Sequence, residues 1–311
     1  MDKPAPTARV LVVHYSQTGQ LDRALESMLR PLEEDPACVV DYLRLTPVDP
    51  YPFPWPLVRF INAFPESIHD CGCPLVPDEN PRHDRYDLVV LGYQVWFLSP
   101  SIPVTAFLQS DMARQLLADT PVVTLVACRN MWLQAQEKVK AHLRRLGASL
   151  VGHAALVDES GSAASFLSTP LWVLSGHKGP FWFGIPRAGV SQSDIARADR
   201  FGVALRERLR GDQLLDTGVW QGLGAVHIND KLIASEKIAT RSFYVWGKLF
   251  LACGGPDAWL RKPLALIYAV FLITMILTVV PASALLKKLF APLLRRRTAR
   301  QRAYYSWPSG E

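Results

Sequence analysis

The feature that most constrains this chain is the alternation of short apolar runs with longer helical patterns over residues 9–210. Each apolar run has the length and composition of a buried strand, and each intervening segment places apolar residues at helical spacing. Such alternation is typical of parallel βαβ units. It predicts an α/β domain over 1–211 with a doubly wound, five-stranded parallel sheet. The expected strands are 9–15, 38–45, 86–93, 120–128 and 148–156, and the expected helices are 21–30, 103–117, 132–146 and 191–210.

Two long segments interrupt this alternation, at 46–84 and at 157–190. Alternating prolines at the start of the first exclude a helix or a central strand there. The second is rich in serine and glycine. Both carry aromatic residues, which could either roof a ligand with an apolar pocket or form a small core of their own. We refer to these segments as the first and second excursions.

The loop after the first expected strand has the chemistry of a phosphate site. It leads directly into a helix, whose N-terminus offers unpaired N–H groups and the positive end of the helix dipole. Hydroxyls add donors, and glycine lets the backbone approach a phosphate closely. Neither GxxxxGK[ST] nor GxGxxG is present, which disfavours an NTPase or the usual dinucleotide fold. A capped turn without a ligand is the alternative. The loop residues are Ser16, Gln17, Thr18, Gly19, Gln20 and Leu21.

This loop resembles the FMN phosphate loop of the flavodoxin family, S/T-x-T-G-x-T, except that Leu21 stands where that family usually has Thr. The resemblance extends over residues 8–210 without the excursions and implies a flavodoxin-like fold with FMN as cofactor. It also implies two further flavin loops, after the third and fourth strands. An aromatic ring such as Trp96 could stack on the flavin or simply cap the sheet. The implied residues are Tyr93, Gln94, Val95, Trp96 and Phe97 in the second loop, and Cys128, Arg129 and Asn130 in the third.

Cysteine usage and the N-terminal residues indicate a cytoplasmic domain. The five cysteines are odd in number and lack the spacing of a zinc site or a disulfide framework. Cys71 and Cys73 are too close together for the usual zinc motifs. The first apolar stretch, 10–13, has only the length of a strand, so no secretory signal is expected. We therefore expect neither a metal site nor export.

The net charge of +6 is concentrated at the C-terminal end. Residues 287–311 hold seven basic residues and one acid, so 1–286 is neutral overall. The globular part is therefore not expected to bind nucleic acid. A basic tail that follows an apolar segment is instead typical of contact with anionic lipid head groups.

The apolar segment 263–286 carries no charge. At about 1.5 Å per helical residue it is long enough to cross a bilayer, which predicts a membrane helix that holds the domain on the cytoplasmic face. A buried core helix is the alternative. A single span would place the basic residues of 287–311 outside the cytoplasm, although short basic flanks usually remain inside it. A re-entrant or interfacial helix is therefore a further alternative. The preceding linker, 212–262, includes an aromatic stretch at 242–253 that suits a membrane interface.

The start VVHYSQTGQL, the loop LGYQVWFLSPSIP and the hydrophobic C-terminal part together resemble the bacterial dialkylresorcinol condensing enzymes. In those pathways a ketosynthase forms a dialkylcyclohexanedione and a partner protein aromatises the ring. The chain shows no thiolase-like Cys-His-Asn set, which favours the aromatising step. That step is an oxidation of the kind a flavin performs. The resemblance implies an FMN-dependent oxidoreductase with a hydrophobic substrate, with membrane lipid and the pathway's ketosynthase as candidate partners.

Two residues are candidates for proton transfer in such a reaction. Tyr93 lies in the second flavin loop, and His177 lies in a polar turn of the second excursion. An unperturbed histidine titrates near a pKa of about 6.5, which suits the task. Two other functions remain open because a fold does not determine an activity. One is an NAD(P)H-dependent quinone or flavodoxin-type reductase, and the other is a non-catalytic membrane scaffold with a degenerate flavodoxin fold.

Overall fold

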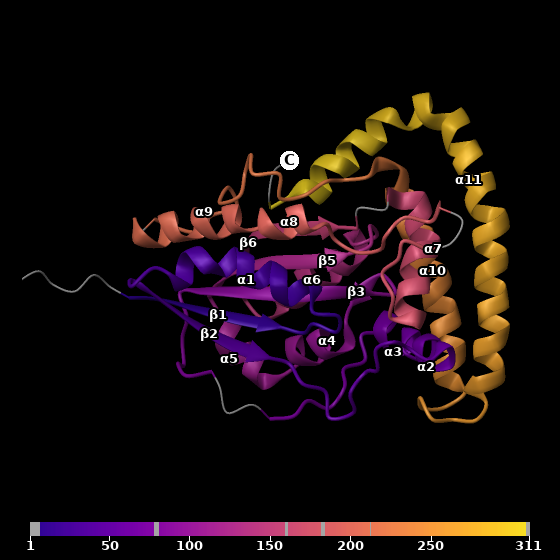
Figure 1. The fold of residues 1–311 in the computed structure, drawn as a ribbon, viewed down its shortest axis with the longest axis horizontal. Helices are drawn as coiled ribbons and strands as arrows, with labels where there is room; N and C mark the ends of the chain where they lie inside the picture. Colours follow the sequence, from indigo (N-terminus) through magenta and orange to yellow (C-terminus); the bar gives the residue numbers. More distant parts are fainter. Residues whose placement is uncertain (1–6, 78–80, 159–160, 182–183, 212, 309–311) are drawn as a thin grey trace, which may run out of the picture.

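A parallel sheet with the strand order β2-β1-β3-β5-β6 forms the centre of the molecule (Figure 1). The computed structural model describes residues 7–77, 81–158, 161–181, 184–211 and 213–308, without the side chains of 161–166 and 279–294. The order reverses between β1 and β3, as in a doubly wound sheet, and confirms the predicted flavodoxin-like α/β fold. The parallel strands are β1 (Ala8–His14), β2 (Cys38–Arg44), β3 (Leu88–Trp96), β5 (Pro121–Cys128) and β6 (Ser149–Val157).

Helices cover both faces of the sheet, which explains why the strands read as continuous apolar runs. Side chains of α1, α8 and α9 pack with Val10 and Val12 on one face. Those of α4, α5 and α6 pack with Leu11 and Val13 on the other. The helices are α1 (Gln20–Glu33), α4 (Ile102–Leu108), α5 (Asp111–Leu117), α6 (Leu133–Arg145), α8 (Gln192–Ala196) and α9 (Asp199–Arg210).

Two helices expected from the sequence are each divided in the structure. The predicted helix at 103–117 is interrupted at Ser110, whose hydroxyl accepts a hydrogen bond from Ala113 N and caps α5. The predicted helix at 191–210 comprises α8 and α9, and Ser191 caps α8 through Asp194 N. Side-chain caps of this kind favour a helix start and so compete with an uninterrupted helix.

Both excursions have their helices at the carboxyl edge of the sheet, where the strands end (Figure 1). They are joined to one another because Trp55 N donates a hydrogen bond of 2.9 Å to Val173 O. No helix was predicted in either excursion, yet each contains helical residues. The first holds α2 (Leu57–Asn62) and α3 (Phe64–Ile68), and the second holds α7 (Gly161–Ser175).

Two long helices complete the described chain, α10 (Asp230–Ala252) and α11 (Arg261–Ser306). The segment predicted as a linker thus contains α10, and the predicted membrane helix and basic tail form one continuous helix, α11. The window Arg261–Thr278 of α11 has a mean hydropathy of 1.6, and 17% of it is buried. It is the one helix among the described residues that is long and apolar enough to cross a membrane.

Helices α1 and α9 approach so closely that only glycine fits at their contact. A Cβ added to Gly202 of α9 would lie 1.7 Å from the backbone oxygen of Met28 in α1. We expect Gly202→Ala to destabilise the fold, because overpacking costs about 1–3 kcal/mol. Because the clash is with backbone, the cost lies at the upper end of this range and exceeds the gain of about 1 kcal/mol that alanine brings within a helix. The urea midpoint of unfolding measures the loss.

Gly255→Ala is the matched control, since no atom lies within 4 Å of the added Cβ. Its free energy of unfolding should change by less than about 0.5 kcal/mol. Equal midpoints for the two variants would show that α1 and α9 are not in this close contact.

Candidate functional site

The three loops predicted to hold a flavin all emerge at the carboxyl edge of the sheet. The first follows β1, and the third begins at Cys128, the last residue of β5. The second needs correction, because β3 continues to Trp96, so Tyr93, Gln94, Val95 and Trp96 belong to the strand and only Phe97 follows it. The three strands are neighbours in the sheet. Parallel strands place their carboxyl ends at one edge, and ligands of such folds bind where the strand order reverses. The excursions and the C-terminal helices gather around the same edge (Figure 1).

The loop after β1 keeps groups that suit a phosphate. The Ser16 side chain is buried, and its Oγ has no hydrogen-bond partner among the described residues. Gly19 precedes α1 with a φ of 73°, and no side chain caps this helix N-terminus. A Cβ at Gly19 would meet nothing within 4 Å. The first turn of α1 therefore presents uncapped N–H groups beside a buried hydroxyl that lacks a partner.

Other residues of this loop hold the excursions or the core. Gln17 Nε2 donates to Pro52 O at 2.9 Å, and Gln20 Nε2 donates to Val190 O at 3.3 Å. Thr18 is half-buried. Leu21 is fully buried in the core beneath α1, so its side chain does not face a ligand. Within this loop, Ser16, Thr18 and Gly19 remain the residues best placed for a phosphate.

Lys178 lies within electrostatic range of two other basic side chains, Arg23 and Arg187, and we call the three residues the basic cluster. Burial lowers the pKa of Lys178, and the neighbouring positive charges of Arg23 and Arg187 lower it further. Lys178 and Arg187 belong to the second excursion, and Arg23 belongs to the first turns of α1. An excess of positive charge beside uncapped helical N–H groups favours an anion. No local pattern in the sequence indicates this cluster, since Arg23 is far from Lys178 and Arg187 along the chain.

The loop after β3 is a tight hairpin with an unusual backbone. Residues Val95 and Trp96 pair with Pro100 and Ser99 of β4 (Ser99–Pro100). The two residues between the strands, Phe97 and Leu98, have φ values of 48° and 62°. A two-residue turn with both φ positive normally uses Asn and Gly. Here two bulky apolar residues adopt it, which is a strained backbone of the kind found at functional sites.

Trp96 lies in an aromatic cluster rather than on an open surface. Its ring meets the edges of Tyr15, Tyr51 and Trp55 at centroid distances of 5.8, 4.9 and 5.5 Å. The Phe97 ring packs on Phe60 at 4.9 Å, toward α2. The first excursion therefore supplies aromatic rings that cover the second loop.

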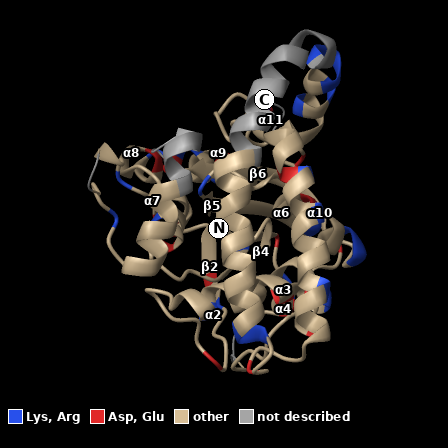
Figure 2. Cartoon of the chain, turned by 90° about the vertical axis from the view of Figure 1, so that its right-hand side faces the viewer, with Lys and Arg blue, Asp and Glu red and all other residues tan. Residues whose placement is uncertain are grey.

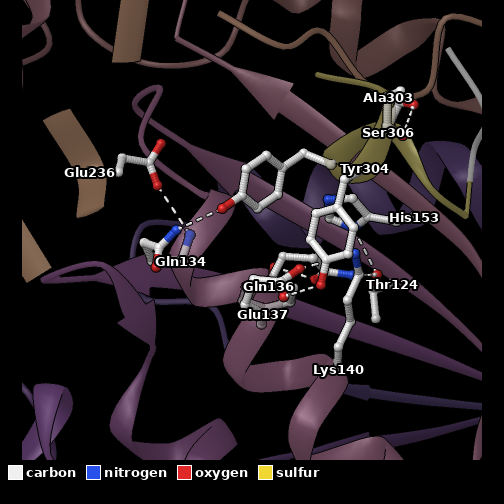
Figure 3. A network of polar contacts seen from close by, with 12 residues as sticks. Thr124, Gln134, Gln136, Glu137, Lys140, His153, Glu236, Ala303, Tyr304 and Ser306 are labelled. Atoms are coloured by element: carbon white, nitrogen blue, oxygen red, sulfur yellow. Dashed lines mark hydrogen bonds and ion pairs between the residues drawn. The ribbon is translucent and has the colours of Figure 1, made fainter. Parts of the chain in front are cut away.

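The assignment of Tyr93 as a proton-transfer residue needs correction. Its side chain is fully buried, and its hydroxyl donates to Gln136 Oε1 at 2.7 Å. Gln136 Nε2 donates in turn to Thr124 Oγ1, which lies 2.7 Å from His153 Nδ1 (Figure 3). Burial raises the pKa of Tyr93 well above 10.0. Tyr93 is thus part of an internal network between the sheet and α6.

The neighbouring residues Gln94 and Val95 are half-buried and serve the hairpin. Gln94 O accepts a hydrogen bond of 2.9 Å from Ser101 N. The other proton-transfer candidate, His177, is exposed, and its backbone N–H donates to Ser175 Oγ at 3.2 Å. It lies in the turn that follows α7, next to Lys178 of the basic cluster.

The loop after β5 is held by hydrogen bonds to the residue that follows β6. Asp158 N donates to Cys128 O and to Arg129 O at 3.0 and 3.2 Å, which ties the loop to the end of β6. Burial raises the pKa of the Cys128 thiol and lowers that of Arg129 to about 10. Asn130 is half-buried at the end of the loop. Cys128 is therefore a neutral thiol at physiological pH and a poor nucleophile.

A buried carboxyl group that no sequence pattern indicates contacts this region. Glu236 of α10 is fully buried, and its Oε2 accepts a hydrogen bond of 3.1 Å from Gln134 N in the first turn of α6 (Figure 3). Its Oε1 has no hydrogen-bond partner among the described residues. Desolvation by burial raises the pKa of Glu236 to about 8. The carboxyl group caps α6 directly after the third loop and so links α10 to it.

Two cavities among the described residues lie away from these loops. One of about 440 Å³ is at the opposite, amino edge of the sheet, where Arg9 and Asp87 contribute to its lining. One of about 240 Å³ lies between α6 and the chain around Trp307. Among the described residues, no group of three or more His, Cys, Asp or Glu side chains could hold a metal ion.

Searches against protein families and curated proteins found no match. Solved structures with low similarity include a flavoprotein from Lactobacillus acidophilus in complex with FMN. It is 16% identical, with 48% of this chain and 93% of that chain covered and a TM-score of 0.36. A flavodoxin from the domain Archaea is 9% identical, covering 65% and 99%, with a TM-score of 0.36. Flavodoxin 1 from Bacillus cereus is 11% identical, covering 67% and 99%, with a TM-score of 0.35.

Glu236 makes the stability of the protein depend on pH in a defined direction. Burial raises its pKa from 4.5 to about 8. Between these values the unfolded chain releases a proton that the folded chain retains. The free energy of unfolding therefore falls as the pH rises through this window, by at most about 1.4 kcal/mol per pH unit. Glu236→Gln should remove this part of the pH dependence.

Urea unfolding at several pH values between 4.5 and 8 measures the difference in the free energy of unfolding between wild type and Glu236→Gln. Glu207→Gln is the matched control because Glu207 is exposed on α9. A difference between wild type and Glu236→Gln that stays constant across the window would contradict the raised pKa of Glu236.

Proposed function

We propose that this chain binds FMN, with the flavin phosphate at the loop Ser16–Gly19 and the N-terminus of α1. The carrying observation is the buried Ser16 hydroxyl without a hydrogen-bond partner, beside a helix start that no side chain caps. The basic cluster of Arg23, Lys178 and Arg187 supports the proposal, since a phosphate is an anion.

The proposed reaction is the aromatisation of a dialkylcyclohexanedione to a dialkylresorcinol. It removes two protons and two electrons from the ring, and bound FMN would supply the acceptor for a hydride equivalent. The resemblance carried by the VVHYSQTGQL start and the LGYQVWFLSPSIP loop supports this substrate class. The ring of such a substrate needs a dry, apolar surface with a few polar groups.

The first excursion supplies such a surface next to the second loop. Tyr51 and Trp55 cover Trp96, and Phe53 contacts Trp172 of the second excursion at 5.9 Å. These rings exclude water from the carboxyl edge of β3. His177 remains the candidate for proton transfer, because Tyr93 is buried in the internal network.

Removing the groups that suit the phosphate should weaken FMN binding selectively. We expect Ser16→Ala and Lys178→Ala each to raise the Kd for FMN about 10- to 100-fold, since a hydrogen bond to a charged group contributes about 1.5–3 kcal/mol. The Kd for riboflavin, which lacks the phosphate, should change little. Quenching of flavin fluorescence measures both constants.

Ser149→Ala is the matched control, because Ser149 is exposed at the amino end of β6. It should leave both constants unchanged. Equal losses of FMN and riboflavin affinity in Ser16→Ala would place the phosphate elsewhere, and wild-type protein without affinity for either flavin would favour a non-catalytic scaffold.

Turnover tests the reaction separately. Under anaerobic conditions, adding a dialkylcyclohexane-1,3-dione to the FMN-loaded protein should bleach the visible flavin band and yield one resorcinol per flavin. The yield follows from the two-electron stoichiometry. Bleaching by NAD(P)H, with no response to the dione, would instead identify a reductase. A cyclohexane-1,3-dione without alkyl chains is the matched substrate control and should react more slowly.

A further inference from the structure

The two ends of α11 are attached to the same globular body. At its start, Arg261 is fully buried, with Nη1 2.8 Å from Glu66 Oε1 of α3 and Nε donating to Phe250 O of α10. Two turns later, the ring of Tyr268 stacks on Phe64 at 4.5 Å. The first part of α11 is therefore fixed to α3 and α10.

The far end of α11 returns to the domain. Tyr305 is buried, and its hydroxyl accepts a hydrogen bond of 3.3 Å from Gln134 Nε2. Tyr304 OH donates to Glu137 Oε2 at 2.7 Å (Figure 3). A straight helix of 46 residues would reach about 69 Å at 1.5 Å per residue. α11 instead bends and comes back over the domain (Figure 1). A single crossing of a bilayer would put its two ends on opposite sides, which this fold does not allow.

Between its ends, α11 exposes an apolar stripe. Leu266, Val270, Ile273 and Leu277 are 57–70% exposed and follow one another at helical spacing. The neighbouring helix α10 adds a second exposed stripe, and the turn between the helices adds further apolar side chains. These additional residues are Ile238, Val245, Leu249, Trp259 and Leu260. We call both stripes together the hairpin face.

Helices α10 and α11 lie side by side, so the stripes adjoin. Trp246 of α10 contacts Tyr268 and Phe271 of α11 at 5.2 and 5.0 Å. A contiguous exposed apolar surface of this kind marks an interaction site. Because 17% of the apolar window is buried, α11 is not the buried core helix that the sequence left as an alternative.

The charges around the hairpin face identify its partner. Lys248 and Lys262 border it on one side, and exposed arginines at 295–302 lie beyond its other end. Figure 2 faces this side and shows no charged residue in the described part of α11 between Lys262 and Thr278. No acidic residue occurs between Asp257 and Glu311. An apolar surface bordered by bases complements the acyl chains and anionic head groups of a lipid leaflet. A second copy would instead bring the same arginines together.

We propose that the hairpin face docks onto one leaflet of an anionic bilayer, with both ends of α11 on the side of the globular domain. The protein is then monotopic rather than membrane-spanning. This inference does not depend on flavin binding, and vesicle flotation tests it without flavin or substrate.

Flotation with preformed phosphatidylcholine–phosphatidylglycerol vesicles should carry full-length protein to the top of the gradient, and phosphatidylcholine alone should carry less. V270E together with L277E should lower the floated fraction at least about ten-fold, because both changes put charge on the hairpin face. L214E is the matched control: Leu214 is 87% exposed outside α10 and α11, so the variant should float like wild type. Circular dichroism verifies that each variant is folded.

Topology is measured with an epitope tag placed after Glu311 and protease added outside the sealed vesicles. Complete removal of the tag is expected. Protection of the tag would show a spanning helix and overturn the proposal. The proposal also fails if the folded double variant floats like wild type, or if the wild type ignores both vesicle types and forms a dimer that the double variant lacks.

Discussion

Parallel pairing of the five long strands is the constraint on which the rest of the structure depends. Each strand needs helices on both faces of the sheet, and every return connection delivers the chain to the same edge. The carboxyl ends of β1, β3 and β5 therefore meet as neighbours. The residues beyond these strand ends do not form hydrogen bonds with a neighbouring strand, so their hydroxyls and N–H groups are available to a ligand. All the features that we assign to flavin binding lie at this edge.

Segments outside the basic fold complete the site. The second excursion brings Lys178 within electrostatic range of Arg23 in α1, and the first packs Tyr51 and Trp55 on Trp96. Helix α10 contributes Glu236 to the first turn of α6. Helices α10 and α11 at this edge have an apolar outer surface, so the proposed phosphate site and the proposed lipid contact are joined in one structural unit.

This arrangement suits a substrate with long alkyl chains, if both proposals hold. The hairpin face would hold the carboxyl edge close to the lipid leaflet, and the aromatic cluster around Trp96 continues from that edge toward α2. An apolar molecule could then pass from lipid to the site without crossing water, which would cost free energy for each exposed methylene group. The ion pair between Arg261 and Glu66 attaches the first turn of α11 to α3, which lies at the same edge of the sheet as the candidate site.

The sequence by itself determined the five parallel strands, most helices and the loop that joins β1 to α1, because periodicity and helix-start chemistry are local properties of the chain. It could not place Tyr93, which stands at the end of the predicted strand 86–93 but lies within the longer β3, buried against α6. Nor could it indicate the turn at Phe97 and Leu98, since neither residue favours positive φ. Tertiary structure alone decided the basic cluster, the role of Glu236 and the return of Tyr305 to α6. Each of these joins residues distant in sequence, and such contacts form only when the whole sheet and its covering helices have packed.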